Sequence, residues 1–524
     1  MAKPSVLRSS LVMASATFCS RILGLVREQL MALYFGASGL TDAFLVAYRI
    51  PNLLRDLLAE GAFSSAFVPT FTEARQESAQ EGRRLLWELF VLLGSLTAVL
   101  SVLIFAFAPQ LIALFAPSFV ADAEKFELTV TLTRIMCPFL FFISLAALFM
   151  GALNSLKVFF IPALAPAAYN VMSILAMVLL AGALERLGHA PVLCLGWGAM
   201  LGGLMQALVQ LPLLWKKGLA PVRIGRLGSA RARKVILLLG PGLIGFAATQ
   251  INLLVNTVLA TSAAVGATSW LNYAFRVFQL PVGILSVSIG SSNLVHFSSA
   301  WKKGERAEAL RALSSSYYLS YLAVLPAMAL LYVFSEETIR IIFERGRFSA
   351  ESTAMTAAAL RMYVLGLPLY SLYKIWGPTF YALDRQRIPV ISSLIGVAFN
   401  IAFCWWMTPR FGFAMLALGT TLSMLLNCLI LAVMLRRVLV LELSFFVDAR
   451  LLKLMLSAGA MAAVAECARR QWPAPPEGVL RQLLHLSSLS FIALGVFALS
   501  MLILGERAAL KRLVERFTSR GKKG

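Results

Sequence analysis

The chain has 524 residues, of which 59% are hydrophobic and 14% are charged, and its formal net charge is +22. A soluble domain carries about 25% charged residues, so this composition excludes a soluble protein and indicates an integral membrane protein with many helical spans. The apolar runs are long and continuous, which excludes a membrane β-barrel, whose strands alternate apolar and polar side chains. In a soluble protein the positive charge would suggest nucleic acid. Here it indicates basic loops that contact anionic membrane lipids, and we expect no nucleic-acid partner.

Fourteen apolar segments reach the length of about 20 residues that a helix needs to cross the bilayer. An even number of spans places both ends of the chain on the same side of the membrane. Basic residues decide which side, because they collect in cytoplasmic loops. Most of them lie in loops that are inside when the N-terminus is inside, so we predict that both termini are cytoplasmic. The predicted spans are 7–33, 38–72, 86–115, 126–153, 160–184, 191–216, 232–262, 266–300, 310–335, 351–382, 387–408, 411–438, 449–468 and 481–504.

The chain also repeats itself weakly at an offset of 227 positions. The segment 41–54 (TDAFLVAYRIPNLL) then lies on 268–281 (TSWLNYAFRVFQLP), and Arg49 meets Arg276. Chance similarity between two apolar helices is the alternative, but the paired arginines argue against it. Six spans separate the two segments, so both run in the same direction, and a parallel repeat of two lobes is typical of transporters.

The predicted fold is therefore an all-α polytopic membrane protein of about 14 transmembrane helices. Two pseudo-symmetric six-helix lobes are followed by two additional C-terminal helices. The N-lobe is predicted at 1–217 (spans 1–6), the C-lobe at 218–440 (spans 7–12), spans 13 and 14 at 441–505, and a basic cytoplasmic tail at 506–524. No loop is long enough for a separate domain, so recognition is expected within the membrane or at its faces.

Charged side chains interrupt spans 1, 2 and 8. A charge in the middle of the bilayer costs about 2.5–3.5 kcal/mol on insertion scales, so such residues usually face a polar cavity or a charged partner. At a rise of about 1.5 Å per residue, several cations from both lobes fall near the middle of the membrane. They are Arg21, Arg27, Arg49 and Arg276.

Few buried acids balance these arginines, and Glu28 is the obvious partner for three guanidinium groups. An excess of buried positive charge needs an anion, and the planar fork of arginine suits phosphate, so we predict a central cavity that holds phosphate or pyrophosphate. Gly24 and Pro51 predict that spans 1 and 2 bend or break beside it. The alternative is that each arginine pairs with a nearby acid and merely joins helices, which explains Arg55 equally well. The predicted substrate-binding residues are Arg21, Arg27, Arg276, Arg49 and Arg55, and the predicted gating or charge-partner residues are Glu28, Asp42 and Glu60.

The chain lacks the residue spacing of a metal site or a catalytic centre. Its six cysteines and three histidines are scattered, so we expect no metal and no cofactor. No nucleotide-binding loop and no Ser/His/Asp set is visible, so a transporter is favoured over an enzyme such as a membrane glycosyltransferase. A structural scaffold would leave the buried arginines unexplained. Energy for transport would come from the membrane potential, a gradient of a monovalent cation or the supply of substrate.

Two stretches resemble the MurJ (MviN) family of bacterial lipid II flippases, which belongs to the MOP exporter superfamily. They are SRILGLVRE (20–28) and TDAFLVAYRIPNLLRDLLAEGAFSSAFVP (41–69). The resemblance continues through NYAFRVFQLPVGILSVSIG (272–290) and FYALDRQRIPV (380–390), and it extends over the whole chain, including the two additional helices.

The resemblance implies a flippase that moves lipid II, the undecaprenyl-pyrophosphate-linked disaccharide-pentapeptide, from the inner to the outer leaflet of the bacterial inner membrane for peptidoglycan synthesis. It implies alternating access between the two lobes and a groove for the polyprenyl tail in spans 13 and 14. We expect a monomer whose partners are lipid II and membrane lipids. The cavity arginines of the family correspond to Arg21, Arg27 and Arg276, and further functional polar residues to Asp42 and Arg55.

The chain departs from the family pattern at several positions. Glu28 stands where the family usually has Asp, and Phe275 stands where it usually has an acid. Some members build a sodium site from spans 7, 11 and 12, but no convincing carboxylate lies in those spans here, so ion coupling stays open. One alternative is a MOP-type exporter of another polyprenyl-linked glycan. The other is a drug or cation antiporter, whose cavity should favour carboxylates over arginines.

Overall fold

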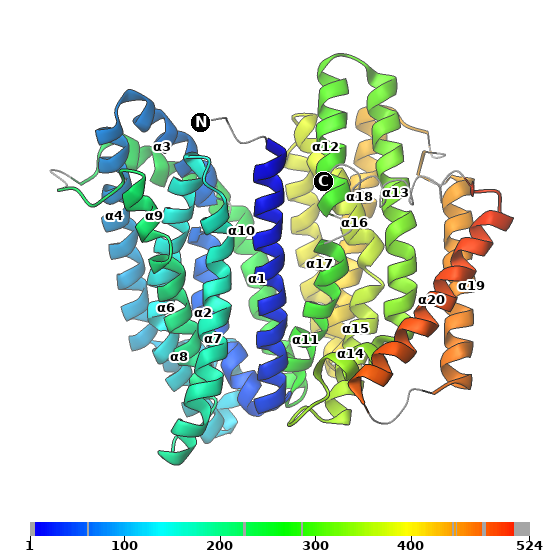
Figure 1. Ribbon diagram of the computed structural model, residues 1–524, viewed down its shortest axis with the longest axis horizontal. Helices are drawn as coiled ribbons and strands as arrows, with labels where there is room; N and C mark the ends of the chain where they lie inside the picture. The colour runs from blue at the N-terminus through cyan, green and yellow to red at the C-terminus, as the bar shows by residue number, and fades with distance from the viewer. Residues whose placement is uncertain are drawn as a thin grey trace. The chain divides into compact units, whose positions relative to one another are not determined.

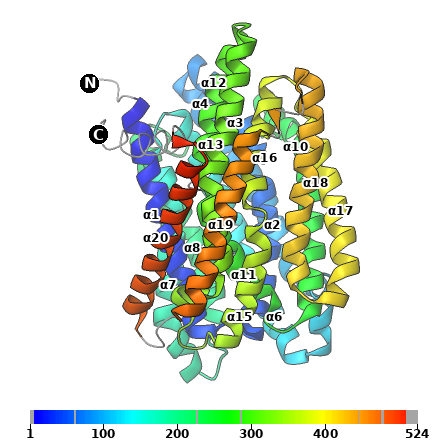
Figure 2. The same cartoon turned by 90° about the vertical axis from the view of Figure 1, so that its right-hand side faces the viewer.

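The computed structural model describes residues 6–59, 62–223, 227–283, 287–442, 445–446, 448–473 and 478–507. In these residues all regular secondary structure is helical, which confirms the predicted all-α fold (Figures 1 and 2). A helix satisfies its backbone N–H and C=O groups within its own segment, as hydrocarbon surroundings require. The elements are α1 (Val6–Phe35), α2 (Gly39–Ala59), α3 (Ala62–Glu77), α4 (Ala79–Ala106), α5 (Ala108–Phe115), the 3-10 helix η1 (Pro117–Ala121), α6 (Ala123–Ser155), α7 (Phe160–Arg186), α8 (Leu193–Leu208), α9 (Leu211–Lys216), α10 (Ala230–Ala263), α11 (Ala267–Pro281), α12 (Val287–Lys302), α13 (Arg306–Val333), α14 (Ser335–Phe343), α15 (Ala350–Val364), α16 (Leu367–Ala382), α17 (Arg387–Phe411), α18 (Ala414–Leu439), α19 (Ala449–Gln471) and α20 (Val479–Ile503).

The described residues contain nine helices that are long and apolar enough to cross a membrane. A tenth candidate is the pair α15 and α16, which is bent by 40° at the break between them. Pro368 follows this break directly, and its ring cannot donate a backbone hydrogen bond to a continuous helix. The predicted multi-span membrane protein is thus confirmed, and the total of fourteen spans stays a prediction.

Several predicted spans are pairs of helices in the structure. The segments predicted at 38–72, 86–115, 266–300 and 351–382 are α2–α3, α4–α5, α11–α12 and α15–α16. α1 continues through Gly24 and α2 continues through Pro51, so neither helix is broken there, and a bend at these residues stays a prediction. Hydropathy does not predict α14, because its sequence SEETIRIIF carries three charged residues in nine.

The offset of 227 positions also relates the bounds of whole helices. α4 and α13 begin and end 227 positions apart, and α7 and α17 begin 227 positions apart. The same offset relates α6 to the pair α15 and α16, at both the first and the last residue. The weak similarity in sequence is therefore accompanied by a repeated order and length of helices, in which α10 corresponds to α1.

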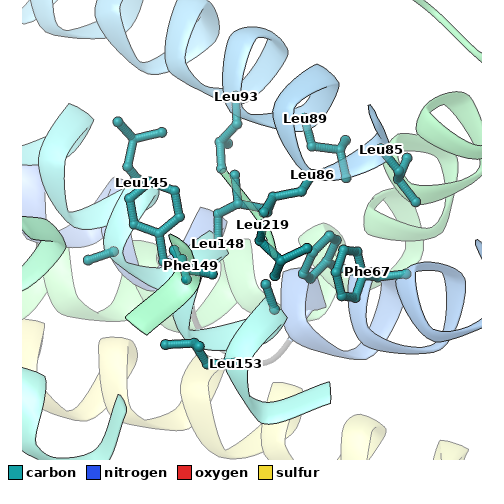
Figure 3. Close-up of a cluster of buried hydrophobic side chains, with 14 of the residues drawn as sticks. Phe67, Leu85, Leu86, Leu89, Leu93, Leu145, Leu148, Phe149, Leu153 and Leu219 are labelled. Atoms are coloured by element: carbon teal, nitrogen blue, oxygen red, sulfur yellow. The ribbon is translucent and has the colours of Figure 1, made fainter. Parts of the chain in front are cut away.

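The chain forms two compact units, each with its own core. Unit 1 is Met1–Ser269 with Arg345–Phe348, and unit 2 is Trp270–Glu344 with Ser349–Gly524. In unit 2 one apolar cluster joins α12, α13, α16 and α18, and another packs α19 and α20 against α13. The division of the lobes at residue 217 stays a prediction, and α10 packs against α3 within unit 1. The core of unit 1 joins α3, α4 and α6 and includes Phe67, Leu85, Leu86, Leu89, Leu93, Leu145, Leu148, Phe149, Leu153 and Leu219 (Figure 3).

The segment between α9 and α10 is fastened to α4. Leu219 is buried in the core of unit 1, and its carbonyl accepts a hydrogen bond from the indole Nε1 of Trp87 at 3.0 Å. Arg83 donates from Nη2 to the carbonyl of Pro221 at 3.2 Å. Two side chains of α4 therefore hold the backbone that leads into α10.

The start of α10 is fastened to α4 as well. Glu88 is only 4% exposed, and its carboxylate accepts from the backbone N of Ser229 at 2.7 Å and from its hydroxyl at 2.6 Å. Ser229 is the N-cap of α10, and its Oγ accepts from the backbone N of Ala232. Glu88 therefore fixes the residue that caps α10, and its negative charge lies at the favourable end of the helix dipole.

We predict that Glu88→Ala lowers the free energy of unfolding by about 1–3 kcal/mol, because the N–H and hydroxyl of Ser229 lose their hydrogen bonds to a buried carboxylate. Thermal unfolding in detergent measures this loss. Lys234→Ala is the control, because Lys234 and its partner Glu73 are 52% and 59% exposed, and such pairs contribute about 0–1 kcal/mol. Equal melting temperatures for the two variants would contradict this role of Glu88.

Candidate functional site

Arg27 of α1 is the predicted cavity arginine whose surroundings the structure describes most fully. Its Nη2 donates to Glu28 Oε1 at 2.6 Å, and the two side chains are 18% and 4% exposed. Consecutive residues of a helix do not normally face each other, so both side chains turn from their own directions to make this pair. The guanidinium also lies over the ring of Tyr169, with its carbon 5.3 Å from the ring centroid. The predicted pairing of Glu28 with a cavity arginine is present for Arg27.

Close packing of α1 against α7 explains why these side chains meet. Asn170 donates from Nδ2 to the carbonyl of Ser20 at 3.1 Å. Gly24 faces the same amide, and a Cβ at this position would lie 3.6 Å from Asn170 Nδ2. Gly24 is therefore a contact point between two helices, and the ring of Tyr169, one residue before Asn170 in α7, reaches Arg27.

The structure describes fewer contacts for the other predicted arginines. Arg21 is exposed on α1, and Arg276 is exposed on α11 in unit 2. Arg49 of α2 donates from Nη1 to Thr257 Oγ1 of α10 at 2.9 Å, within unit 1. The side chain of Arg55 and the whole of Glu60 lie outside the described residues. A cavity that gathers these arginines stays a prediction.

Asp42 is fully buried and caps a helix that is distant in sequence. It is 1% exposed, and its carboxylate accepts from the backbone N of Gly266 at 2.6 Å and from the N and Oγ of Ser269 at 2.9 and 2.6 Å. These groups lie at the start of α11, whose first-turn N–H groups have no partner within the helix. Asp42 thus satisfies them and places a negative charge at the favourable end of the helix dipole.

The sequence contains a signal for this contact that composition and depth do not reveal. Asp42 and Ser269 are 227 positions apart, which is the offset of the internal repeat. Residues that occupy equivalent positions in the two copies therefore touch each other. Whether Asp42 also acts as a gate stays a prediction.

A backbone contact joins α1 to the segment Arg345–Phe348 within unit 1. The N of Arg347 donates to the carbonyl of Leu33 at 3.0 Å. Gly36 and Gly346 make this approach possible, since a Cβ on either would lie 2.3 or 2.4 Å from a carbonyl oxygen of the other segment. Both glycines also have positive φ angles, of 64° and 58°, which a residue with a side chain rarely adopts. Sequence reasoning does not predict this contact.

Arg134 and Arg361, which interrupt other spans, have local partners. Arg134 of α6 is exposed, and its guanidinium lies over the ring of Phe105 and donates to the carbonyl of that residue. Arg361 of α15 donates to the hydroxyl of Ser335 at 2.7 Å. Among the described residues no group of three His, Cys, Asp or Glu side chains could hold a metal ion.

We predict that Asp42→Asn lowers the free energy of unfolding by about 1–3 kcal/mol, because an amide keeps one acceptor oxygen where three donors converge. Asp122→Asn is the matched control. Asp122 is an exposed N-cap of α6 that accepts from Lys125 N at 3.1 Å, and Asn is as good an N-cap as Asp. Thermal unfolding of both variants in detergent tests the difference, which should be absent if Asp42 is not a structural cap.

An all-helical chain with repeated helices, many apolar spans and arginines within those spans defines a multi-span membrane transporter. The chain belongs to the lipid II flippase MurJ family, whose model matches residues 31–474. A lipid II flippase MurJ of Burkholderia cenocepacia is 36% identical over 438 residues, which cover 83% of this chain and 84% of the relative. A probable lipid II flippase MurJ of Rhizobium meliloti is 36% identical over 434 residues, covering 82% and 80%.

Solved structures agree with this assignment. A lipid II flippase MurJ in an inward closed conformation is 26% identical and has a TM-score of 0.78, covering 94% of this chain and 100% of that one. An inward-facing multidrug resistance MATE family transporter of the MOP superfamily has a TM-score of 0.65 over 82% of this chain and 98% of that one. Its identity of 13% shows a shared fold alone.

Proposed function

We propose that this protein moves lipid II from the inner to the outer leaflet of the bacterial inner membrane by alternating access between two lobes. Membership of the lipid II flippase MurJ family, with 36% identity to the Burkholderia cenocepacia relative, supports the substrate. The arrangement of Arg27 is the observation that carries the chemistry. Its half-buried guanidinium donates one hydrogen bond, to Glu28, within the described residues, and its other N–H groups suit a phosphate.

The pyrophosphate is the part of lipid II that is hardest to carry through hydrocarbon, because its charge would lose its hydration there. In our proposal Arg27 binds it together with Arg21 and Arg276, while Arg49 and Arg55 extend the positive surface. Glu28 keeps Arg27 neutralised when no lipid is bound. The apolar tail would stay at the protein surface, against α19 and α20, and so would not need a polar path.

The membrane potential is the energy source that the charge of the substrate favours. Each elementary charge that crosses the membrane is worth about 2.3 kcal/mol per 100 mV. A negatively charged pyrophosphate that moves outward from a negative interior gains this energy, so no nucleotide and no cofactor is needed. In our proposal both termini are cytoplasmic, the protein acts as a monomer in contact with membrane lipids, and a monovalent cation gradient is the alternative source.

Arg21→Ala, Arg27→Ala and Arg276→Ala should each abolish growth of a strain that depends on this protein as its flippase, because the pyrophosphate loses a counter-charge. The accompanying measurement is the amount of lipid II in the inner leaflet, which should rise. Arg134→Ala is the control, since this arginine is exposed beside Phe105 and should not matter. Full growth of all three cavity variants would exclude the arginine site. Accumulation of a different polyprenyl-linked glycan would favour an exporter of that glycan.

The proposed energy source predicts a response to voltage. Purified protein in liposomes with labelled lipid II should move it faster toward the positive side when a potassium gradient and an ionophore impose about 100 mV, and more slowly when the sign is reversed. Protein-free liposomes give the background rate. Equal rates at both signs would exclude the membrane potential and direct attention to a cation gradient.

A further inference from the structure

The guanidinium of Arg27 has a different neighbour on each side. One edge is occupied by Glu28, through the 2.6 Å hydrogen bond from Nη2. The guanidinium also lies over the ring of Tyr169, with its carbon 5.3 Å from the ring centroid. The side chain is still 18% exposed, so it is not fully enclosed by these neighbours. A partly exposed cation beside one acid and one aromatic ring is a candidate receptor for an anion.

Residues of α6 and α8 pack closely against the ring of Tyr169. Gly202 of α8 lies directly against it, since a Cβ at position 202 would lie 2.6 Å from Tyr169 Cδ2 and 3.0 Å from its carbonyl oxygen. The ring of the fully buried Phe139 lies beside it, with 5.8 Å between centroids. The ring therefore has little room to move away from Arg27, because α6 and α8 pack against it.

The second copy of the internal repeat contains neither of these side chains. At the offset of 227 positions, Leu254 replaces Arg27 and Gly396 replaces Tyr169 in the second copy. The arginine and the ring are both absent there, whereas Arg49 retains its counterpart, Arg276. The arginine and its ring are therefore features of the first copy alone.

We propose that Tyr169 is a positioning residue of the anion site, which deepens the proposed function and rests on it. Its ring keeps water from one face of the Arg27 guanidinium and holds the plane so that the open edge points at one phosphate of the substrate. Excluding water lowers the local dielectric and strengthens the attraction between arginine and phosphate, and a fixed plane favours two parallel hydrogen bonds.

The test is the affinity of purified protein in nanodiscs for lipid II. Tyr169→Leu should weaken binding by roughly three- to thirtyfold, the range of a partly desolvated cation–π contact. Tyr169→Phe restores the ring and should bind more tightly than the leucine variant. Phe90→Leu is the matched control, because it removes a ring that contacts Trp87 and Phe149 and should bind as the wild type does.

Salt provides a readout that a loss of packing would not change. With one face of Arg27 open to water, the affinity of Tyr169→Leu should fall more steeply than that of the wild type between 50 and 500 mM salt, a range over which the Debye length falls roughly threefold. Wild-type affinity in Tyr169→Leu, equal losses in the phenylalanine and leucine variants, or parallel salt dependences would overturn the inference. Failure of the wild type to bind lipid II would instead overturn the proposed function.

Discussion

A charge inside the hydrocarbon layer has to find its partners within the protein, because no water supplies them. Two buried acids of unit 1 meet this requirement by capping helices: Asp42 satisfies the start of α11, and Glu88 holds the N-cap of α10. A buried carboxylate without a partner costs free energy, and so does a backbone N–H group without an acceptor. Each of these two acids bonds to such N–H groups, so both costs are reduced. The positions of two helices therefore depend on two carboxylates that belong to other helices.

Arg27 also finds partners within the protein, but they do not enclose its side chain completely. Glu28 pairs with its Nη2 and the ring of Tyr169 lies beside it, but the side chain remains 18% exposed. An arginine whose N–H groups all bonded to protein would only join helices. The proposed function depends on the exposed part of Arg27. Glu28 balances the charge of Arg27 when no substrate is bound.

Much of the fold follows from hydropathy, because an apolar run in lipid must be helical, and the predicted segments correspond to helices or to pairs of helices. The sequence also indicated Glu28 as a partner for the arginines, since few other acids lie in these spans, but it could not show that the pair forms with Arg27, because consecutive residues of a helix do not normally face each other. It did not indicate α14, whose charges hide it from hydropathy, or the approach of Gly36 to Arg347, which brings together segments far apart in the chain. Composition could not show that Gly24 serves packing, because a glycine fits a bend and a close contact equally well.

The contact between Asp42 and Ser269 limits how alike the two copies of the repeat can be. The two residues hold equivalent positions and touch each other. Two aspartates in this place would repel each other, and two serines would bring no formal charge to the start of α11. A carboxylate acceptor opposite a hydroxyl donor avoids both problems, and it requires the two copies to carry different residues at this pair.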